Sequence, residues 1–149
     1  MPKPAALAPA APAPVPLPKP ALQIGDIFGQ PGKRDWTPNE IVQKTSGLRG
    51  VAGALIAMPD GLLVAGQLPA GLSGETIAAF LPQMFGRMTQ YTKELKFKET
   101  DNLTLIVENV PLQIYKTGNL YFAVLGRAGE ILPQLQLKII AAALGPQTR

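Results

Sequence analysis

Residues 50–69, GVAGALIAMPDGLLVAGQLP, are the most hydrophobic stretch of this chain, and they limit its possible folds most strongly. The stretch holds a single charged residue, and about twenty apolar residues are enough for a membrane-spanning helix. That charge is Asp60, however, and it lies between Pro59 and Gly61 near the middle of the stretch. An Asp at the centre of a bilayer costs about 2.5–3.5 kcal/mol, and a Pro beside it interrupts the helix. The stretch therefore does not predict a membrane span.

The central residues MPDG are instead typical of a tight turn. Pro presets φ, the Asp side chain can bond to the nearby backbone, and Gly readily adopts a positive φ. The segments 51–58 and 62–67 on either side have the length of β-strands. The stretch therefore predicts a β-hairpin inside a globular domain.

The composition excludes several kinds of catalytic chemistry. The chain has no Cys and no His, which leaves it without disulfides, thiolates, imidazole bases or the usual zinc ligands. It contains no phosphate-binding loop, dinucleotide fingerprint or nucleophile elbow. Its two serines, Ser46 and Ser73, lie where helix ends are expected, and no His can serve as their base. We therefore expect no catalytic residue, no cofactor, no metal site and no enzyme activity.

The net charge of +4 is small, and the only local cluster of basic residues is Lys93, Lys96 and Lys98. No recognisable nucleic-acid-binding motif accompanies this cluster, so we expect no nucleic-acid partner. Prolines interrupt the apolar residues at the N-terminus, which argues against a signal peptide. With no membrane span predicted either, we expect a soluble, cytoplasmic protein.

The first 35 residues differ in composition from the remainder. Residues 1–20 contain eight of the sixteen prolines and predict a solvated, semi-rigid polyproline spacer. Residues 21–35 carry Leu22, Ile24, Ile27 and Phe28, which either pack on the domain, the more ordinary alternative, or form a short ligand for a partner. We expect residues 1–35 to be a largely disordered arm and linker, and residues 36–149 to be one domain.

Two helix starts have clear signals. Thr37 and Glu40 form a capping box around Pro38 and predict a first helix, and Ser73 caps a long helix that ends near residue 95. Apolar residues recur along the long helix every three or four positions, with further apolar residues beside them, and Pro82 predicts a kink. So much apolar surface needs cover on two sides, from the chain's own sheet and from a partner.

The remaining segments complete a mixed α/β domain of the α+β type. Segments 103–107, 112–117 and 120–125 predict strands, and 132–144 predicts a last helix, giving the order αββαβββα. The strands 51–58 and 120–125 are apolar on both faces and should be central. Hairpin connections then predict a five-stranded antiparallel sheet of order 2-1-5-4-3, with two helices on one face and the long helix on the other.

This topology leaves the strand 103–107 as an exposed edge, beside a long helix with excess apolar surface. Both features predict a homodimer. The expected interface residues come from the long helix and the edge strand: Ile77, Phe80, Leu81, Met84, Phe85, Met88, Tyr91, Leu103 and Leu105.

Three segments carry a resemblance to a known family: GLRGVAGALIAMPDGLLVAG (47–66), SGETIAAFLPQMF (73–85) and FAVLG (122–126). The chain resembles the Roadblock/dynein light-chain domain, particularly the bacterial MglB-like regulators of Ras-like GTPases. The resemblance implies a profilin-like fold, a dimer joined through the long helix and the third strand, and no active site. It also implies that the chain binds a small Ras-like GTPase or serves as an assembly platform.

Two arginines are candidates for facing a GTPase, Arg87 on the long helix and Arg127 after the last strand. An arginine supplied in trans can accelerate GTP hydrolysis by about 10³–10⁵. The resemblance implies instead an activator that repositions the GTPase's own groups. The main alternative is a passive dimeric scaffold that tethers another complex through its proline-rich arm. A metabolite sensor would need a polar pocket that the sequence does not reveal.

Overall fold

The computed structural model describes residues 23–33, 35–98 and 100–144, and all structural statements below concern these residues. Helices and strands follow one another in an order close to the predicted one, with one short helix added at the start. Their bounds are α1 (Ile24–Ile27), α2 (Pro38–Ser46), β1 (Val51–Ala57), β2 (Leu63–Gln67), α3 (Gly74–Glu94), β3 (Asn102–Val107), β4 (Val110–Thr117), β5 (Leu120–Gly126) and α4 (Gln134–Leu144).

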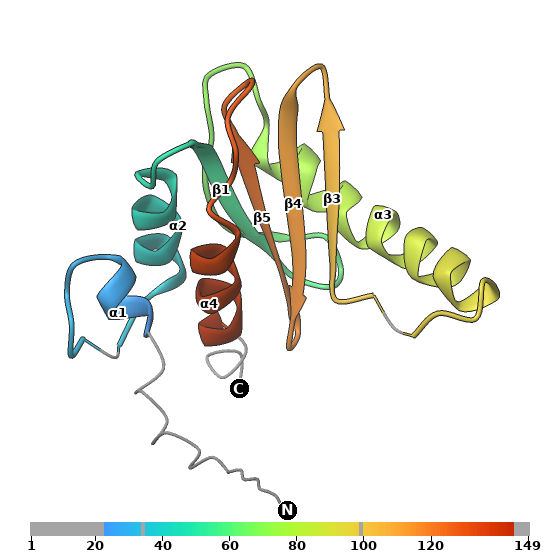
Figure 1. Ribbon diagram of the computed structural model, residues 1–149, viewed down its shortest axis with the longest axis horizontal. Coiled ribbons are helices and arrows are strands. Elements are labelled where there is room, and N and C mark those ends of the chain that lie inside the picture. Colours follow the sequence, from blue (N-terminus) through green and yellow to red (C-terminus); the bar gives the residue numbers. More distant parts are fainter. Residues whose placement is uncertain (1–22, 34, 99, 145–149) are drawn as a thin grey trace, which may run out of the picture.

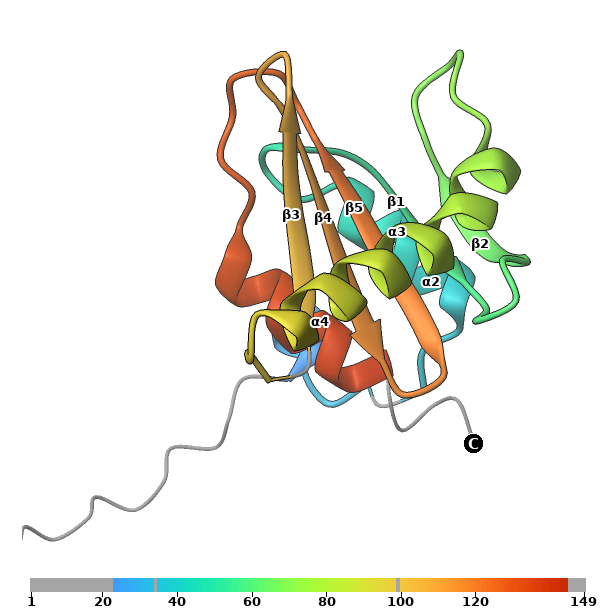
Figure 2. The same ribbon diagram turned by 90° about the vertical axis from the view of Figure 1, so that its right-hand side faces the viewer.

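The five strands form one antiparallel sheet of order β2-β1-β5-β4-β3, as the hairpin connections predict. Helices α1, α2 and α4 lie on one face of this sheet, and α3 crosses the other face (Figures 1 and 2). The predicted fold class and strand order are therefore confirmed. The long third helix is continuous through Pro82.

The turn between β1 and β2 has the chemistry that the sequence suggests. Gly61 adopts a φ of +90° and its N–H donates to the carbonyl of Met58 at 2.9 Å. The N–H of Leu62 donates to the carboxylate of Asp60 at 3.1 Å. The most hydrophobic stretch of the chain is thus a hairpin, and its first strand lies inside the sheet between β2 and β5.

Two hydrophobic cores sandwich the sheet. One lies under α2 and α4 and includes Ile41, Phe122 and Ile140, and the other lies under α3 and includes Leu55 and Leu81. The central strands β1 and β5 contribute side chains to both cores, which explains why their sequences are apolar on both faces. A single helix, α3, lies over the second core (Figure 2). Among the described residues, no second helix covers the remainder of that face of the sheet (Figure 2).

The N-terminal helix α1 extends the packed body beyond the expected domain start at residue 36. Ile24 is buried in the first core, and the rings of Phe28 and Trp36 meet edge to face at 5.3 Å. The apolar residues described after position 22 therefore pack on their own domain. Residues 1–22, where the proline-rich spacer is expected, lie outside the described residues.

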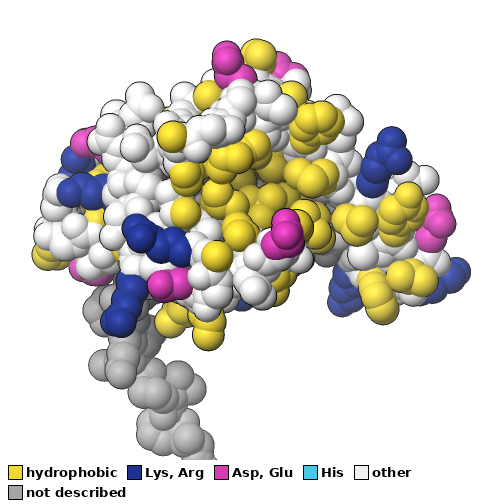
Figure 3. Space-filling view, turned by 90° about the horizontal axis from the view of Figure 1, so that it is seen from above, with side chains coloured by type: hydrophobic (Ala, Val, Ile, Leu, Met, Phe, Trp, Pro, Cys, Tyr) yellow, Lys and Arg dark blue, Asp and Glu magenta, His cyan; other side chains and the backbone are white. Residues whose placement is uncertain are grey.

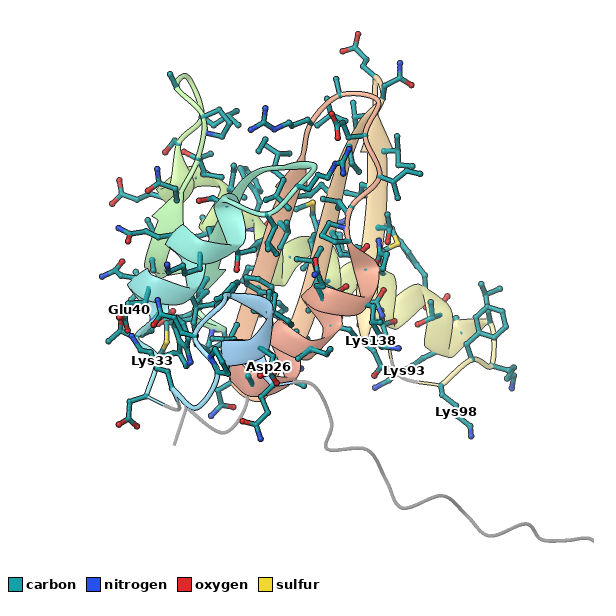
Figure 4. All side chains as sticks on the ribbon, turned by 60° about the vertical axis from the view of Figure 1, so that its left-hand side comes forward. Asp26, Lys33, Glu40, Lys93, Lys98 and Lys138 are labelled. Atoms are coloured by element: carbon teal, nitrogen blue, oxygen red, sulfur yellow. The ribbon has the colours of Figure 1, made fainter. Side chains whose placement is uncertain are left out.

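Lys33 ties the end of this N-terminal segment to the start of α2. Its ammonium lies 2.7 Å from a carboxylate oxygen of Glu40 and 4.4 Å from the centre of the Trp36 ring (Figure 4). The N–H of the Trp36 ring donates to the carbonyl of Lys33 at 3.0 Å. Hydrogen bonds from Lys33 and from the backbone N–H of Thr37 lower the pKa of Glu40 from 4.5 to about 2.

This ion pair predicts a pH dependence of stability. Because the pKa of Glu40 is lower in the folded chain, its contribution is complete above about pH 4.5 and is lost as the pH falls towards about 2. Glu40→Gln should therefore flatten the fall in the free energy of unfolding over this window, measured by urea titration at successive pH values. Glu94→Gln, a second exposed glutamate at a helix end, is the control. Equal slopes for both variants would contradict the assignment.

Candidate interface on helix α3 and strand β3

Helix α3 has two apolar faces, separated by roughly a quarter of a turn. Leu81 and Phe85 point towards the sheet and are 0% and 2% exposed. Phe80 and Tyr91 lie on the second face and are 52% and 49% exposed. The positions of the second face follow the helical period, with three or four residues between neighbours: Ile77, Phe80, Met84, Met88 and Tyr91. We call these five residues the outer stripe.

The first half of the outer stripe borders an apolar groove. The groove has a volume of about 300 Å³ and lies between α3, the loop before it, and strands β1, β4 and β5. In the view from above, hydrophobic atoms gather over a broad area that is hollowed near its centre (Figure 3). The groove is lined by Leu55, Leu68, Leu72, Thr76, Ile77, Phe80, Met84, Leu112, Ala123 and Leu125.

The second half of the outer stripe lies on the part of α3 that projects past β3 (Figures 1 and 2). Met88 and Tyr91 are exposed there, and Leu95 and Phe97 follow at 64% and 65% exposure. Scattered exposed apolar residues are ordinary, but a continuous apolar strip beside an apolar groove marks an interaction surface. Among residues 23–33, 35–98 and 100–144, an extended apolar surface on this side is therefore left uncovered.

Strand β3 is an open edge. All six of its residues pair in continuous register with β4, and within the described residues no strand lies beyond it in the sheet. On the α3 side, Leu103 and Leu105 are half-buried, and Leu103 packs against the second core. The strand contains no proline, no bulge and no charged residue, the usual features that keep an edge from pairing.

The opposite edge, β2, is protected. Its register with β1 shifts between Ile56 and Ala57, which pair with Ala65 and Leu63. Val64 between them has no pairing partner in the ladder and forms a bulge. Bulges bend and twist an edge strand and disfavour addition of a further strand. Of the two edges, β3 is therefore the one suited to strand pairing.

The structure corrects two of the expected interface residues. Leu81 and Phe85 lie in the chain's own core, because α3 turns that face towards the sheet, so neither can face a partner. Phe80, also among the expected residues, lies in the exposed stripe. The other expected residues lie on the outer stripe or on β3: Ile77, Phe80, Met84, Met88, Tyr91, Leu103 and Leu105.

The groove residues that sequence reasoning missed include four leucines, Leu68, Leu72, Leu112 and Leu125. Two of them lie in the loop between β2 and α3, and two lie on neighbouring strands. The only sequence signal of Leu68 and Leu72 is leucine in a loop that otherwise contains small residues and proline, and no spacing connects any of the four to α3. The folded chain alone brings them together.

The two candidate arginines do not form one site. Arg87 is exposed on α3. Arg127 follows β5, where its side-chain Nε donates to the carbonyl of Val51 at 3.5 Å beside a polar depression lined by Ser46 and Gln67. Each arginine therefore has to be considered separately as a contact for a partner.

Two kinds of feature are absent from the described part of the chain. Within it, no three His, Cys, Asp or Glu residues come together in a group that could hold a metal ion. Among its helices, none combines the length and the apolar character that crossing a bilayer requires. The side of the domain formed by α3 and β3 can bind an apolar surface and can pair with a β-strand.

This arrangement of helices around the sheet is a profilin-like α+β fold. The model of the Roadblock/LC7 domain matches residues 38–126, and the chain belongs to this family. Comparison with curated protein sequences gives no match.

Solved structures agree with this fold. A structure titled "MglB with tetrameric arrangement" has a TM-score of 0.66 at 18% identity, covering 86% of this chain and 95% of that one. Myxococcus xanthus MglB has a TM-score of 0.64 at 14% identity, covering 74% and 93%. Schizosaccharomyces pombe profilin has a TM-score of 0.53 at 13% identity, covering 74% and 95%. At these identities the likeness concerns the fold.

Proposed function

We propose that this chain is a homodimeric, non-catalytic regulator that binds a small Ras-like GTPase in the cytoplasm. The observation that carries the proposal is the outer stripe of α3 beside an apolar groove, next to the open edge of β3. The family and its MglB neighbours support a regulatory role in place of an enzyme. This function needs binding surfaces and no catalytic group of the chain's own.

A dimer joined through β3 accounts for both uncovered features. Two β3 strands paired antiparallel would continue the sheet from one copy into the next. The projecting end of each α3 would then cross onto the sheet of the second copy, with Met88 and Tyr91 directed towards the second copy's groove. Stable interfaces bury about 1,200–2,000 Å², which a strand pair and two helices can supply together.

The GTPase would dock on the surface that the two α3 helices present together. Arg87 is exposed on this helix, where it could contact the GTPase directly. Arg127 lies after β5, so it would contact the GTPase only if the GTPase also covers that end of the sheet. We propose that stimulation of GTP hydrolysis comes from repositioning the GTPase's own groups. In that mechanism neither arginine is supplied to the transition state.

The direct test measures GTP hydrolysis by small Ras-like GTPases, starting with any that a search of neighbouring reading frames finds, with and without this protein. We expect binding and a turnover rate at least about tenfold higher. Because an arginine finger supplies most of the acceleration where it operates, Arg87→Ala and Arg127→Ala should each keep at least about half of the stimulation. Loss of nearly all stimulation in either variant, with binding to the GTPase retained, would show an arginine finger instead. No binding together with no change in rate would contradict the proposal.

The second candidate function is a passive dimeric scaffold, and the position of α1 favours it. This helix packs on the sheet face opposite α3, so the start of the described chain at residue 23 lies away from the outer stripe (Figure 1). An arm attached there could hold another complex while α3 stays occupied. Deleting residues 1–22 keeps Ile24 in the core and separates the two functions. Loss of recruitment with unchanged GTPase binding would support the scaffold.

A further inference from the structure

Gln113 of β4 is a fully buried polar side chain whose oxygen and nitrogen both have hydrogen-bond partners. Its side-chain oxygen accepts hydrogen bonds from the hydroxyl of Thr104 and from the amide of Gln134. Its amide nitrogen donates to the side-chain oxygen of Asn102 at 2.9 Å. The hydroxyl of Tyr115 completes the chain by donating to Gln134 at 3.2 Å. One buried side chain thus connects two residues of the edge strand β3 to the start of α4.

The tight turn at Glu108 and Asn109, both with positive φ, sets the register of β3 at one end, next to the Val107–Val110 pair. The apolar pattern of β3 itself adds little to that register, and Gln113 meets the strand at its other end. The three consecutive residues Leu105, Ile106 and Val107 place apolar side chains on both faces of the strand. A shift of one residue turns every side chain to the opposite face, and only a strictly alternating pattern opposes that shift strongly. In β3 the positions that distinguish the faces are Asn102 and Thr104, the two partners of Gln113.

We propose that Gln113 is a specificity-determining residue for strand pairing, because it holds β3 in a single register. A shift of β3 would remove both β3 partners of an amide that is 0% exposed, and unpaired buried polar groups are strongly unfavourable. In the observed register, Leu103 and Leu105 lie on the α3 side of the sheet. After a shift of one residue both leucines would face α4. The apolar surface that they form on the α3 side of the sheet would then be lost. The effect of the β3 register on pairing with a second copy rests on the homodimer proposed above.

The test compares Gln113→Leu with Thr45→Val, which removes a comparable buried hydrogen bond far from β3. Thr45 is 0% exposed in α2 and its hydroxyl donates to the carbonyl of Ile41 at 2.6 Å. Both changes are made in a Phe80→Glu background, which is expected to be monomeric. After correction for global stability, amide exchange in β3 should be at least about tenfold faster with Gln113→Leu and within about threefold of its parent with Thr45→Val. Equal exchange in the two variants would overturn the proposal.

A second measurement locates the partner strand. The chain has no Cys, so single cysteines at Leu103, Leu105, Ile106 and Val107 can cross-link only to the same position in a second copy. With Gln113 present, one position should dominate the disulfide yield, since a symmetric antiparallel pair places one residue next to the two-fold axis. With Gln113→Leu, the yield should spread over neighbouring positions, and an unchanged dominant position would overturn the role in pairing. If exchange responds as expected but no position cross-links in either protein, the register role stands and the proposed homodimer fails.

Discussion

Leu81→Ala is expected to lower the free energy of unfolding by about 2–5 kcal/mol, the range for a fully buried leucine whose removal leaves a cavity. Leu81 is 0% exposed beneath α3, among Leu55, Ile114 and Tyr121 of the second core. Since α3 covers this core with one helix, its neighbours have few ways to fill the space. Chemical denaturation followed by circular dichroism measures the loss.

The matched control for this prediction is Leu135→Ala. Leu135 is also a helical leucine, on α4, but it is 68% exposed. Leucine and alanine have similar helix propensities, so this variant should stay within about 0.5 kcal/mol of wild type. A similar loss in both variants would show that Leu81 does not hold α3 on the sheet.

Phe80→Glu is expected to separate the proposed dimer while leaving the fold intact. Phe80 is one residue from Leu81 but is 52% exposed on the outer stripe, so a glutamate there stays solvated in the single chain. In the dimer the same carboxylate would be buried against apolar side chains, which is strongly unfavourable. We expect the dissociation constant to rise at least about hundredfold, or about 2.7 kcal/mol, in analytical ultracentrifugation.

Gln83→Glu provides the control for that experiment. Gln83 is exposed on the polar side of the same helix, so the variant adds the same charge to α3 away from the outer stripe. It should sediment as the wild type does. The assignment of the outer stripe would be wrong if Phe80→Glu also sedimented as a wild-type dimer, or if both variants dissociated equally.

The contrast between Phe80 and Leu81 shows where sequence reasoning stops. Apolar residues along α3 cover a wide arc, and several spacings of three and four can be traced through them. A regular series through Ile77, Leu81 and Met84 predicts a single seam, but the helix turns Leu81 to its own sheet and Phe80 outwards. Periodicity gives the width of an apolar surface and says nothing about which part of it the chain itself covers.

Other features were predictable because they depend on neighbouring residues. The capping box of Thr37 and Glu40 and the turn at Gly61 are set within four residues. The strand order follows from short hairpin connections, which require consecutive strands to lie side by side. By contrast, the helical form of α1 was not predicted, although packing of this segment on the domain was the more ordinary alternative, because four residues form a stable helix only when a core receives a side chain such as Ile24.

The order of the main elements, the antiparallel sheet and the family follow from the residues alone, because turn chemistry, caps and short connections act between close neighbours. Three features emerge only when the elements pack: the face of α3 that remains exposed, the contrast between the bulged edge β2 and the open edge β3, and the contact of Gln113 with Asn102 and Thr104. These features depend on how elements distant in sequence rotate against one another as they pack. That rotation is set by the whole core and is not encoded in any single segment.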